Sequence, residues 1–195
     1  MTVQRLRYGN TNTFLVRGTD SSLLVDTDYA GTLPAFFRAL GAAGTDVKDI
    51  GWVMATHYHP DHAGLIGELQ KMGVKLLILE EQLASVHDPD RLFAREGKLR
   101  YIPADETAAE VIPCGESRIF LSKMGIAGEI VSVPSHSPDS VCVLLDNGDC
   151  IVGDLEPYEY LAAYEDNAAL KKDWERVMRV HPKRIRYGHA NEKEY

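Results

Sequence analysis

The sequence predicts an α/β fold in which mixed β-sheets are covered by helices. Strand-length apolar runs alternate with helical patterns in the first half of the chain. The dipeptide Asn147-Gly148 marks a hairpin between two further apolar runs. With 195 residues and 45% hydrophobic content, the chain can bury a two-layer core. We therefore expect a single domain that spans residues 1–195.

The first half of the chain is expected to alternate strands with helices. One helix starts at Thr32, where threonine is a suitable N-cap and Pro34 fits the first turn, and runs to about Gly41. A second helical pattern covers residues 63–72. Strands are expected near residues 4–8, 12–17, 22–26, 50–55 and 74–79.

The second half is expected to contain more strand than helix. A short helix is expected over residues 80–87, and a longer one runs from Asn167 to Val180. Strands are expected near residues 117–122, 128–133, 140–146, 149–153 and 184–187.

Residues 88–116 are harder to assign, because three prolines divide them into short pieces. Long irregular segments near a site often act as lids or substrate loops, and we expect that role here. Within this segment, residues 91–101 carry four cations and two aromatic side chains. A solvated helix face is the default interpretation of such a run, and contact with an anionic substrate is the alternative.

The three cysteines are expected to be free thiols. A two-residue turn at 147–148 would set Leu145 opposite Cys150, which turns the thiols of Cys142 and Cys150 to opposite faces of the sheet. A disulfide between them is therefore not expected, and Cys114 is left as a single thiol. None of the three has ligand spacing, and free thiols are typical of a reducing compartment.

Charge and hydropathy limit the partners of the chain. The formal net charge is −8 and the basic residues are scattered, whereas a polyanion usually needs a basic face, so nucleic acid is not an expected partner. No apolar stretch reaches the about 18 residues of a membrane helix, and residues 1–7 lack the apolar segment of a secretion signal. We expect a cytoplasmic protein without a membrane partner; the sequence indicates no oligomeric state.

The most informative segment is 57–62, which reads His-Tyr-His-Pro-Asp-His and places four potential metal ligands within six positions. It connects the apolar run 50–56 to the helical pattern of residues 63–72. Imidazole and carboxylate together suit a borderline cation such as zinc, with iron or manganese as substitutes where carboxylates bridge two ions. The sequence therefore predicts a metal site on a strand-to-helix loop.

Backbone geometry divides these four ligands into two pairs. In an extended segment, side-chain alternation sends His57 and His59 to one side, where they can share one ion. Pro60 starts the turn, so Asp61 and His62 are displaced towards the next helix. This second pair can reach a second ion.

Three further candidate ligands lie at the ends of expected strands, where open sheets present their reactive loops. They are His136, Asp154 and His189. Together with the segment 57–62 they complete two sites. The alternative is that these are surface loop residues without a ligand role, because short motifs also match by chance.

The remaining histidines and one tyrosine are not expected to bind metal. His87 and His181 have no ligand-spaced neighbour, so a structural or solvated role is expected for both. Alternation turns Tyr58 away from the metals, so it is expected to pack in the interior.

The order of these motifs resembles that of the metallo-β-lactamase superfamily of binuclear metallohydrolases, along nearly the whole chain. The resemblance implies an αββα sandwich of two mixed β-sheets flanked by helices, with metals at one edge. Five segments carry it in family order: residues 23–28 (LLVDTD), 57–62 (HYHPDH), 134–140 (PSHSPDS), 153–154 (GD) and 187–189 (YGH).

The resemblance also implies two divalent metal ions, zinc first, with iron or manganese as alternatives. One ion would be bound by His57, His59 and His136. The other would be bound by Asp61, His62 and His189. Asp154 would bridge the two ions, and Asp26 would orient the metal loop without binding metal.

One departure from the family pattern concerns the third motif. The family usually has glycine where this sequence has Ser135 and again where it has Asp139. Aspartate tolerates left-handed backbone conformations better than most residues, so we expect the loop to form at Asp139.

The implied activity is hydrolysis of a small molecule by a metal-bridging hydroxide, with Asp61 and Asp154 as catalytic carboxylates. Superfamily members act on lactams, lactones, thioesters and phosphodiesters, and some carry out redox reactions at iron. Only six residues follow His189, so the helical C-terminal domain of glutathione-thioester hydrolases is not expected. We predict a small ester, lactone or thioester substrate. The alternatives are a phosphodiesterase, an iron-dependent oxidoreductase or oxygenase, and a non-catalytic metal-binding protein.

Overall fold

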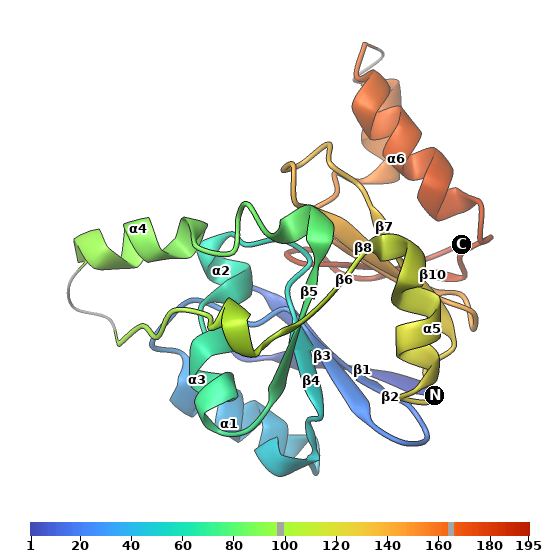
Figure 1. The fold of residues 1–195 in the computed structure, drawn as a ribbon. Helices are drawn as coiled ribbons and strands as arrows, with labels where there is room; N and C mark the ends of the chain where they lie inside the picture. Colours follow the sequence, from blue (N-terminus) through green and yellow to red (C-terminus); the bar gives the residue numbers. More distant parts are fainter. Residues whose placement is uncertain (97–99, 164–165) are drawn as a thin grey trace.

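The computed structural model describes residues 1–96, 100–163 and 166–195. Its strands form two mixed sheets, with helices on the outer faces (Figure 1). The first sheet contains, in spatial order, β1 (Thr2–Arg7), β2 (Asn12–Arg17), β3 (Ser22–Val25), β4 (Trp52–Met54), β5 (Lys75–Leu79) and β6 (Glu110–Ile112). The second contains β11 (Lys193–Glu194), β10 (Arg184–Tyr187), β9 (Asp149–Gly153), β8 (Val141–Leu145) and β7 (Gly128–Ser132). The αββα prediction is confirmed.

Helices and turns connect the strands. The α-helices are α1 (Leu33–Ala42), α2 (Pro60–Ala63), α3 (Ile66–Lys71), α4 (Asp88–Glu96), α5 (Ser117–Ser122) and α6 (Ala168–Met178). The 3-10 helices are η1 (Val47–Asp49), η2 (Glu80–Gln82), η3 (Glu106–Ala108), η4 (Cys114–Glu116) and η5 (Tyr158–Ala162). Across the described ranges, no helix combines the length and the apolar character needed to cross a bilayer.

Side-chain alternation along the strands creates three layers of core. On β2, Phe14 faces the space between the sheets, whereas Leu15 faces outward towards Phe36 of α1. On the outer face of the second sheet, Trp174 of α6 packs on Cys142 and its neighbours in β8 and β9. The central strands of each sheet are therefore buried on both faces, as their nearly continuous apolar sequences require.

The strand directions bring the candidate site residues to one edge. In the first sheet β3 and β4 are parallel, and in the second sheet β9 and β10 are parallel. The loops that leave the carboxyl ends of these four strands carry Asp26, the segment 57–62, Asp154 and His189. Parallel neighbours end at the same edge of a sheet, which is where open sheets place their ligands.

The two predicted helix starts differ in how they are capped. Thr32 precedes α1 and Pro34 lies in its first turn, as predicted, but the Thr32 hydroxyl donates to the Tyr29 carbonyl and does not cap the helix. Asn167 caps α6, because its side-chain oxygen accepts a hydrogen bond from the Leu170 backbone N–H at 3.0 Å.

The prediction of a strand over residues 117–122 is wrong, because this segment forms α5. Its apolar centre suits a strand, but the burial pattern is helical: Phe120 and Leu121 are buried while Ile119 is 66% exposed. The Ser117 hydroxyl stabilises the helix start by donating to the Cys114 carbonyl at 2.6 Å. Tertiary packing therefore overrides the local strand preference.

Three other assignments need correction. The helix predicted over residues 63–72 is the shorter α3, Ile66–Lys71, and a separate turn of helix, α2, ends at Ala63. The helix predicted over residues 80–87 is only the 3-10 turn η2. Residues 88–116 contain α4 and the edge strand β6, so much of this segment is regular; residues 97–99 lie outside the described residues. The suggested role as a lid or substrate loop stays a prediction.

The predicted hairpin register is wrong by one residue. Leu144 pairs with Cys150, because the turn contains three residues, 146–148, and ends at Gly148 in a left-handed conformation, φ +94°. Cys142 and Cys150 therefore lie on the same face of the sheet, in contact with the α6 layer. Both are free thiols in this structure, as is Cys114, but the geometric reason for expecting no disulfide between Cys142 and Cys150 is wrong.

Candidate metal centre

The loop between β4 and α2 has the conformation that its sequence predicts. His59 is extended, with φ −71° and ψ 150°, and Pro60 is the first residue of α2. His57 and His62 are both buried, at 1% and 0% exposure, whereas His59 is exposed. The loop therefore presents one buried and one accessible histidine beside a short helix.

Three histidines converge on one point, and we call them the histidine cluster: His57, His59 and His136. His57 Nε2 lies 2.9 Å from His59 Nδ1, and His136 Nε2 lies 3.3 Å from the same atom. The three residues come from two loops, and His59 and His136, the nearest pair in sequence between these loops, are 77 positions apart.

A second group lies beside the first, and we call it the mixed cluster: Asp61, His62 and His189. His189 Nε2 lies 3.2 Å from Asp61 Oδ2 and 3.2 Å from His62 Nε2. The other ring nitrogen of His189, Nδ1, is 3.2 Å from the Asn10 carbonyl oxygen. This cluster contains one carboxylate, whereas the histidine cluster contains none.

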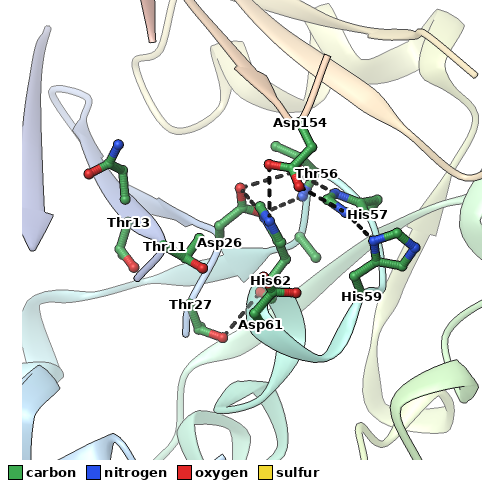
Figure 2. A network of polar contacts seen from close by, with 12 residues as sticks. Thr11, Thr13, Asp26, Thr27, Thr56, His57, His59, Asp61, His62 and Asp154 are labelled. Atoms are coloured by element: carbon green, nitrogen blue, oxygen red, sulfur yellow. Dashed lines mark hydrogen bonds and ion pairs between the residues drawn. The ribbon is translucent and has the colours of Figure 1, made fainter. Parts of the chain in front are cut away.

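Asp154 lies close to histidines of both clusters, and Figure 2 shows its carboxylate next to His57 and His62. Its Oδ1 is 3.3 Å from His62 Nε2, and its Oδ2 is 3.4 Å from His189 Nε2. The same Oδ2 is 3.8 Å from His136 Nε2 and 4.0 Å from His57 Nε2. The carboxylate is therefore placed where it can serve both clusters at once.

Two glycines leave room for this arrangement. A Cβ at Gly188 would lie 2.5 Å from Asp154 Oδ1 and 2.8 Å from His62 Cε1. A Cβ at Gly153 would lie 2.4 Å from Thr56 Oγ1, and the backbone there is left-handed, φ +57°. Any side chain at either position would collide with the cluster or its support.

Asp26 supports the buried part of the site from the end of β3, and Figure 2 shows it behind His62. Its Oδ1 accepts a hydrogen bond from the Thr56 backbone N–H at 2.6 Å. Its Oδ2 accepts from the Thr56 hydroxyl at 2.9 Å and lies 3.0 Å from His62 Nδ1. Asp26 has a left-handed backbone, φ +62°, and is fully buried. It touches both the residue before His57 and the ring of His62.

Burial and charge give the two buried histidines opposite titration behaviour. Burial lowers the pKa of His57 to about 2, helped by His62 and partly opposed by Asp154. Burial also disfavours the charged form of His62, but the Asp26 and Asp154 carboxylates outweigh it and raise its pKa to about 10. Burial acts to raise the pKa of Asp154 too, yet His62 and His189 hold it well below its usual range. A neutral His57 keeps a free lone pair for a cation.

The donor set suits divalent cations. The candidate ligands form three overlapping groups of three residues. Within each group, one ring nitrogen or carboxylate oxygen from every residue lies within 4.8 Å of the others. Nitrogen lone pairs that face one another at about 3 Å repel unless a proton or a cation lies between them. The groups are His57, His59, His136; His57, His62, Asp154; and Asp61, His62, His189. All seven candidate ligands are thus brought together, and their roles as ligands stay predictions.

Two buried residues that sequence reasoning did not place in the site connect the metal loop to the third motif. The Asp139 carboxylate accepts a hydrogen bond from the Tyr58 backbone N–H at 2.7 Å and from the Ser137 hydroxyl at 2.8 Å. Gln82 Nε2 lies 3.0 Å from the Ala55 carbonyl and 3.2 Å from the Asp139 carbonyl, to which it donates. These bonds hold the loop of His57 against the loop of His136.

The departures from glycine in the third motif are accommodated in different ways. Asp139 does not have a left-handed backbone, so the tolerance expected of it is not needed. The Ser135 backbone N–H donates to the Asp173 carboxylate on α6 at 2.8 Å, and Asp173 is paired with Arg176 at 2.7 Å. The loop that carries His136 is thus anchored to α6 on its outer side.

Asn12 supports the fifth motif and was also missed. Its side-chain amide donates to the carbonyls of Tyr187 and Ala190, at 2.9 Å and 2.8 Å, and its backbone N–H donates to the Gly188 carbonyl at 2.7 Å. The amide therefore clamps both sides of His189. Only a contact across more than 170 positions reveals this role, so no local sequence signal could have found it.

The other residues considered from the sequence lie apart from the centre. Tyr58 is buried in the core beneath the first sheet, as predicted. His87 is half exposed and lies 2.9 Å from Asp90, while His181 is exposed at the end of α6. In the cationic stretch, Phe93 is buried against Tyr101, with ring centroids 4.3 Å apart, so this aromatic pair packs inward.

Known proteins resemble this chain in sequence along most of its length. The family model described as the metallo-beta-lactamase superfamily matches residues 6–192. The beta-lactamase-like protein 2 homolog of Drosophila melanogaster is 28% identical over 182 residues, which cover 93% of this chain and 59% of that protein. The lactamase-like protein nscB of Trichophyton rubrum is 27% identical over 73% of this chain and 39% of its own length. The chain therefore spans less than two thirds of these curated relatives.

Solved structures share the fold at low sequence identity. The metallo-beta-lactamase family protein TTHA1429 from Thermus thermophilus superposes with a TM-score of 0.70 and 20% identity, over 99% of this chain and 74% of that chain. TTHA1623, solved in a di-iron-bound form, superposes with a TM-score of 0.70 and 22% identity, over 100% of this chain and 94% of that chain.

Proposed function

The chain belongs to the metallo-β-lactamase superfamily, and on that premise we propose that it is a metal-dependent hydrolase of small esters, lactones or thioesters. The observation that carries the proposal is the convergence of seven donor side chains in two adjoining clusters that share Asp154. A complete donor set with an accessible side suits hydrolysis better than a structural site, which would be closed.

We assign the chain's own residues as follows. The histidine cluster would hold one divalent ion and the mixed cluster the other, with Asp154 between them. When bound, the two ions supply a water molecule of lowered pKa as nucleophile and positive charge that stabilises the developing oxyanion. Asp61 and Asp154 contribute negative charge beside the reacting atoms, and Asp61, His189 and His136 lie on the accessible side, where a substrate can approach.

Asp26, Thr56 and Asp139 would position these ligands without touching the substrate. Partners of this kind fix the tautomer and the ring orientation of metal-binding histidines, and losing one typically costs about 10–100-fold in metal affinity or activity. The Asp26 carboxylate next to His62 Nδ1, at 3.0 Å, is of this type, since it directs Nε2 towards the mixed cluster.

The test is metal content and activity of the same protein. Protein loaded with zinc, and separately stripped with a chelator, is assayed on p-nitrophenyl acetate, a γ-lactone and an acyl thioester. We expect two metal ions per chain and hydrolysis of at least one substrate that is lost on stripping and restored by metal. The matched variants are His136→Ala, which should lose activity, and His181→Asn, an exposed histidine outside the clusters, which should keep it. Metal-loaded protein that hydrolyses none of the three contradicts the proposal.

A second candidate is an iron-dependent oxidoreductase or oxygenase on the same ligands. Two observations favour keeping it: the structural neighbour TTHA1623 was solved in a di-iron-bound form, and imidazole and carboxylate donors suit iron as well as zinc. Elemental analysis of protein purified without added metal separates the candidates. Iron together with oxygen consumption would favour the second, and zinc together with ester hydrolysis the first.

We also propose that the described residues act as one domain in the cytoplasm, on a small molecule. The apolar layer between the sheets receives side chains from both of them, which supports a single folding unit. Three free cysteines are typical of a reducing compartment. Proteolysis that releases a stable half of the chain, or a disulfide in protein isolated from its source, would contradict these points.

A further inference from the structure

A cavity of about 390 Å³ opens beside the metal centre. His136, Asp154 and His189 form the wall that faces the two clusters. The opposite wall comes from the segment that follows β9 and from the end of β10. That wall includes Leu155, Glu156, Pro157, Tyr160 and Tyr187. The volume is that of a site for a small molecule.

The far wall is held in place by the layer formed by α6. The Leu155 backbone N–H donates to the Val152 carbonyl at 3.1 Å, and the Glu156 carbonyl accepts a hydrogen bond from Trp174 Nε1 at 2.8 Å. Trp174 is fully buried, and its ring meets that of Tyr158 with centroids 5.4 Å apart. The wall is therefore preformed, so a ligand would not have to order it on binding.

The chemical character of the cavity is apolar with negative charge. Leu155, Pro157, Tyr160 and Tyr187 present hydrocarbon and ring surface. Apart from the candidate metal ligands, Glu156 is the charged residue among its lining side chains, and no lysine or arginine of the described residues lines it. Nearby, Lys193 is paired with Glu159 and does not line the cavity.

This character discriminates between substrates of different charge. A neutral hydrocarbon chain gains free energy when it leaves water for such a wall. A chain that ends in a carboxylate would lose hydration, would meet Glu156 and would find no cationic side chain there. Metal ions held in the clusters would polarise the carbonyl oxygen at the reacting end of the substrate, but they would not neutralise a charge at the far end of the chain.

We propose that this cavity binds the acyl chain of a neutral ester, lactone or thioester, and that it rejects acyl chains that end in a carboxylate. The inference rests on the proposed function, because it assigns the substrate class of the same site. Tyr160, Pro157 and Leu155 contact the chain, and Glu156 sets the charge preference.

The activity test varies the acyl chain and keeps the leaving group constant. The substrates are the p-nitrophenyl esters of acetate, butanoate and pentanoate, and the mono-p-nitrophenyl ester of glutarate, which has the length of pentanoate with a terminal carboxylate. We expect kcat/KM to rise roughly tenfold from acetate to butanoate, because two methylene groups are buried. We expect pentanoate to exceed glutarate by roughly tenfold or more, because the like charge at Glu156 opposes glutarate.

Two variants and a matched control locate the effect. Tyr160→Ala should flatten the dependence on chain length, and Glu156→Lys should reduce or invert the ratio of pentanoate to glutarate. Glu110→Lys makes the same charge change on β6 of the first sheet, where the side chain is exposed, and should leave both ratios unchanged. Equal kcat/KM for all acyl chains in active protein, or a ratio that Glu110→Lys moves as much as Glu156→Lys, would overturn the inference.

A binding measurement gives a readout that does not depend on turnover. Hexanamide and its counterpart with a terminal carboxylate, adipic acid monoamide, are titrated into metal-loaded protein by calorimetry. We expect hexanamide to bind more tightly, and Tyr160→Ala to weaken it. If this preference holds while no ester is hydrolysed, the proposed function fails and the cavity assignment stands. If the esters are hydrolysed and the carboxylate compound binds as well as hexanamide, the cavity assignment fails and the proposed function stands.

Discussion

The histidine cluster and the mixed cluster start from the same loop but are supported in different ways. In the mixed cluster, His62 Nδ1 lies 3.0 Å from the Asp26 carboxylate. In the histidine cluster, His57 Nδ1 faces the Thr56 hydroxyl at 3.2 Å, and that hydroxyl donates to Asp26. One buried carboxylate thus acts directly on one cluster and through a neutral hydroxyl on the other.

This difference sets the charge of the two sites. The mixed cluster contains a carboxylate, Asp61, and has a second carboxylate behind its buried histidine. The histidine cluster contains three imidazoles and has a hydroxyl behind His57. Burial lowers the pKa of His57, whereas at His62 the carboxylates of Asp26 and Asp154 outweigh burial and raise the pKa. A shared loop can therefore supply two unlike metal sites when its support is asymmetric.

The largest effect is expected where both clusters meet. Asp154→Ala removes the candidate ligand whose carboxylate lies within 4.0 Å of histidines of both clusters. We expect at most one metal ion per chain and a loss of turnover of more than about 100-fold, since an outer partner alone costs about 10–100-fold. Metal analysis and ester hydrolysis measure the two effects. Asp146→Ala, in the turn before β9, is the control. Two metal ions retained in Asp154→Ala would contradict the role of Asp154 as a ligand shared by both sites.

The two clusters can be separated with a matched pair of variants. His136→Ala and His189→Ala each remove one exposed imidazole, so the fold should be retained. We expect each variant to bind one metal ion per chain, in the cluster that is left intact. Cobalt substitution distinguishes them, because the absorption spectrum should report three imidazole ligands in His189→Ala but two imidazoles with the Asp61 carboxylate in His136→Ala, and Asp154 is common to both sites. Identical spectra in the two variants would argue against the partition of ligands.

A smaller effect is expected from the support residues, and it should be unequal. Asp26→Asn keeps a side chain that tolerates the left-handed backbone but removes the charge behind His62. We expect metal affinity in the mixed cluster to fall by about 10–100-fold, and less in the histidine cluster. Thr56→Val should weaken the histidine cluster more than the mixed cluster, because the hydroxyl contacts His57 directly and His62 only through Asp26. Competition with a chromophoric chelator measures both affinities. An equal loss of metal affinity at the two sites in Asp26→Asn would contradict the unequal support of the two clusters by Asp26.

The smallest effect is expected at the connection between loops. Asp139→Ala leaves the buried Tyr58 N–H without its acceptor, which should lower the free energy of unfolding by about 1–3 kcal/mol. Asp139→Asn keeps an acceptor oxygen and should lose less. Urea unfolding of metal-free protein measures the difference. If the two variants are equally stable, the hydrogen bond to Tyr58 contributes nothing measurable.

The sequence was sufficient for those parts of the site that depend on local backbone. Alternation placed His57 and His59 together, and Pro60 started α2. Their positions at the ends of expected strands, and then the order of motifs resembling a known family, indicated His136, Asp154 and His189. The structure brings all three to the loop.

What the sequence did not reveal depends on contacts between distant segments. Gln82, Asp139 and Asn12 act through backbone groups that lie 26 to 178 positions away, so nothing in their own neighbourhoods indicates a role. The strand wrongly expected over residues 117–122 has the same origin, because α5 is selected by the core between the sheets and not by its own composition.

The most direct test of the central claim is anomalous X-ray diffraction from crystals of metal-supplemented protein, recorded on both sides of the metal absorption edge. We expect two anomalous peaks per chain, one for each metal ion. One should lie among His57, His59 and His136, the other among Asp61, His62 and His189, with Asp154 in contact with both. Crystals that show no peak at these side chains, or a single ion held elsewhere, would contradict the central claim.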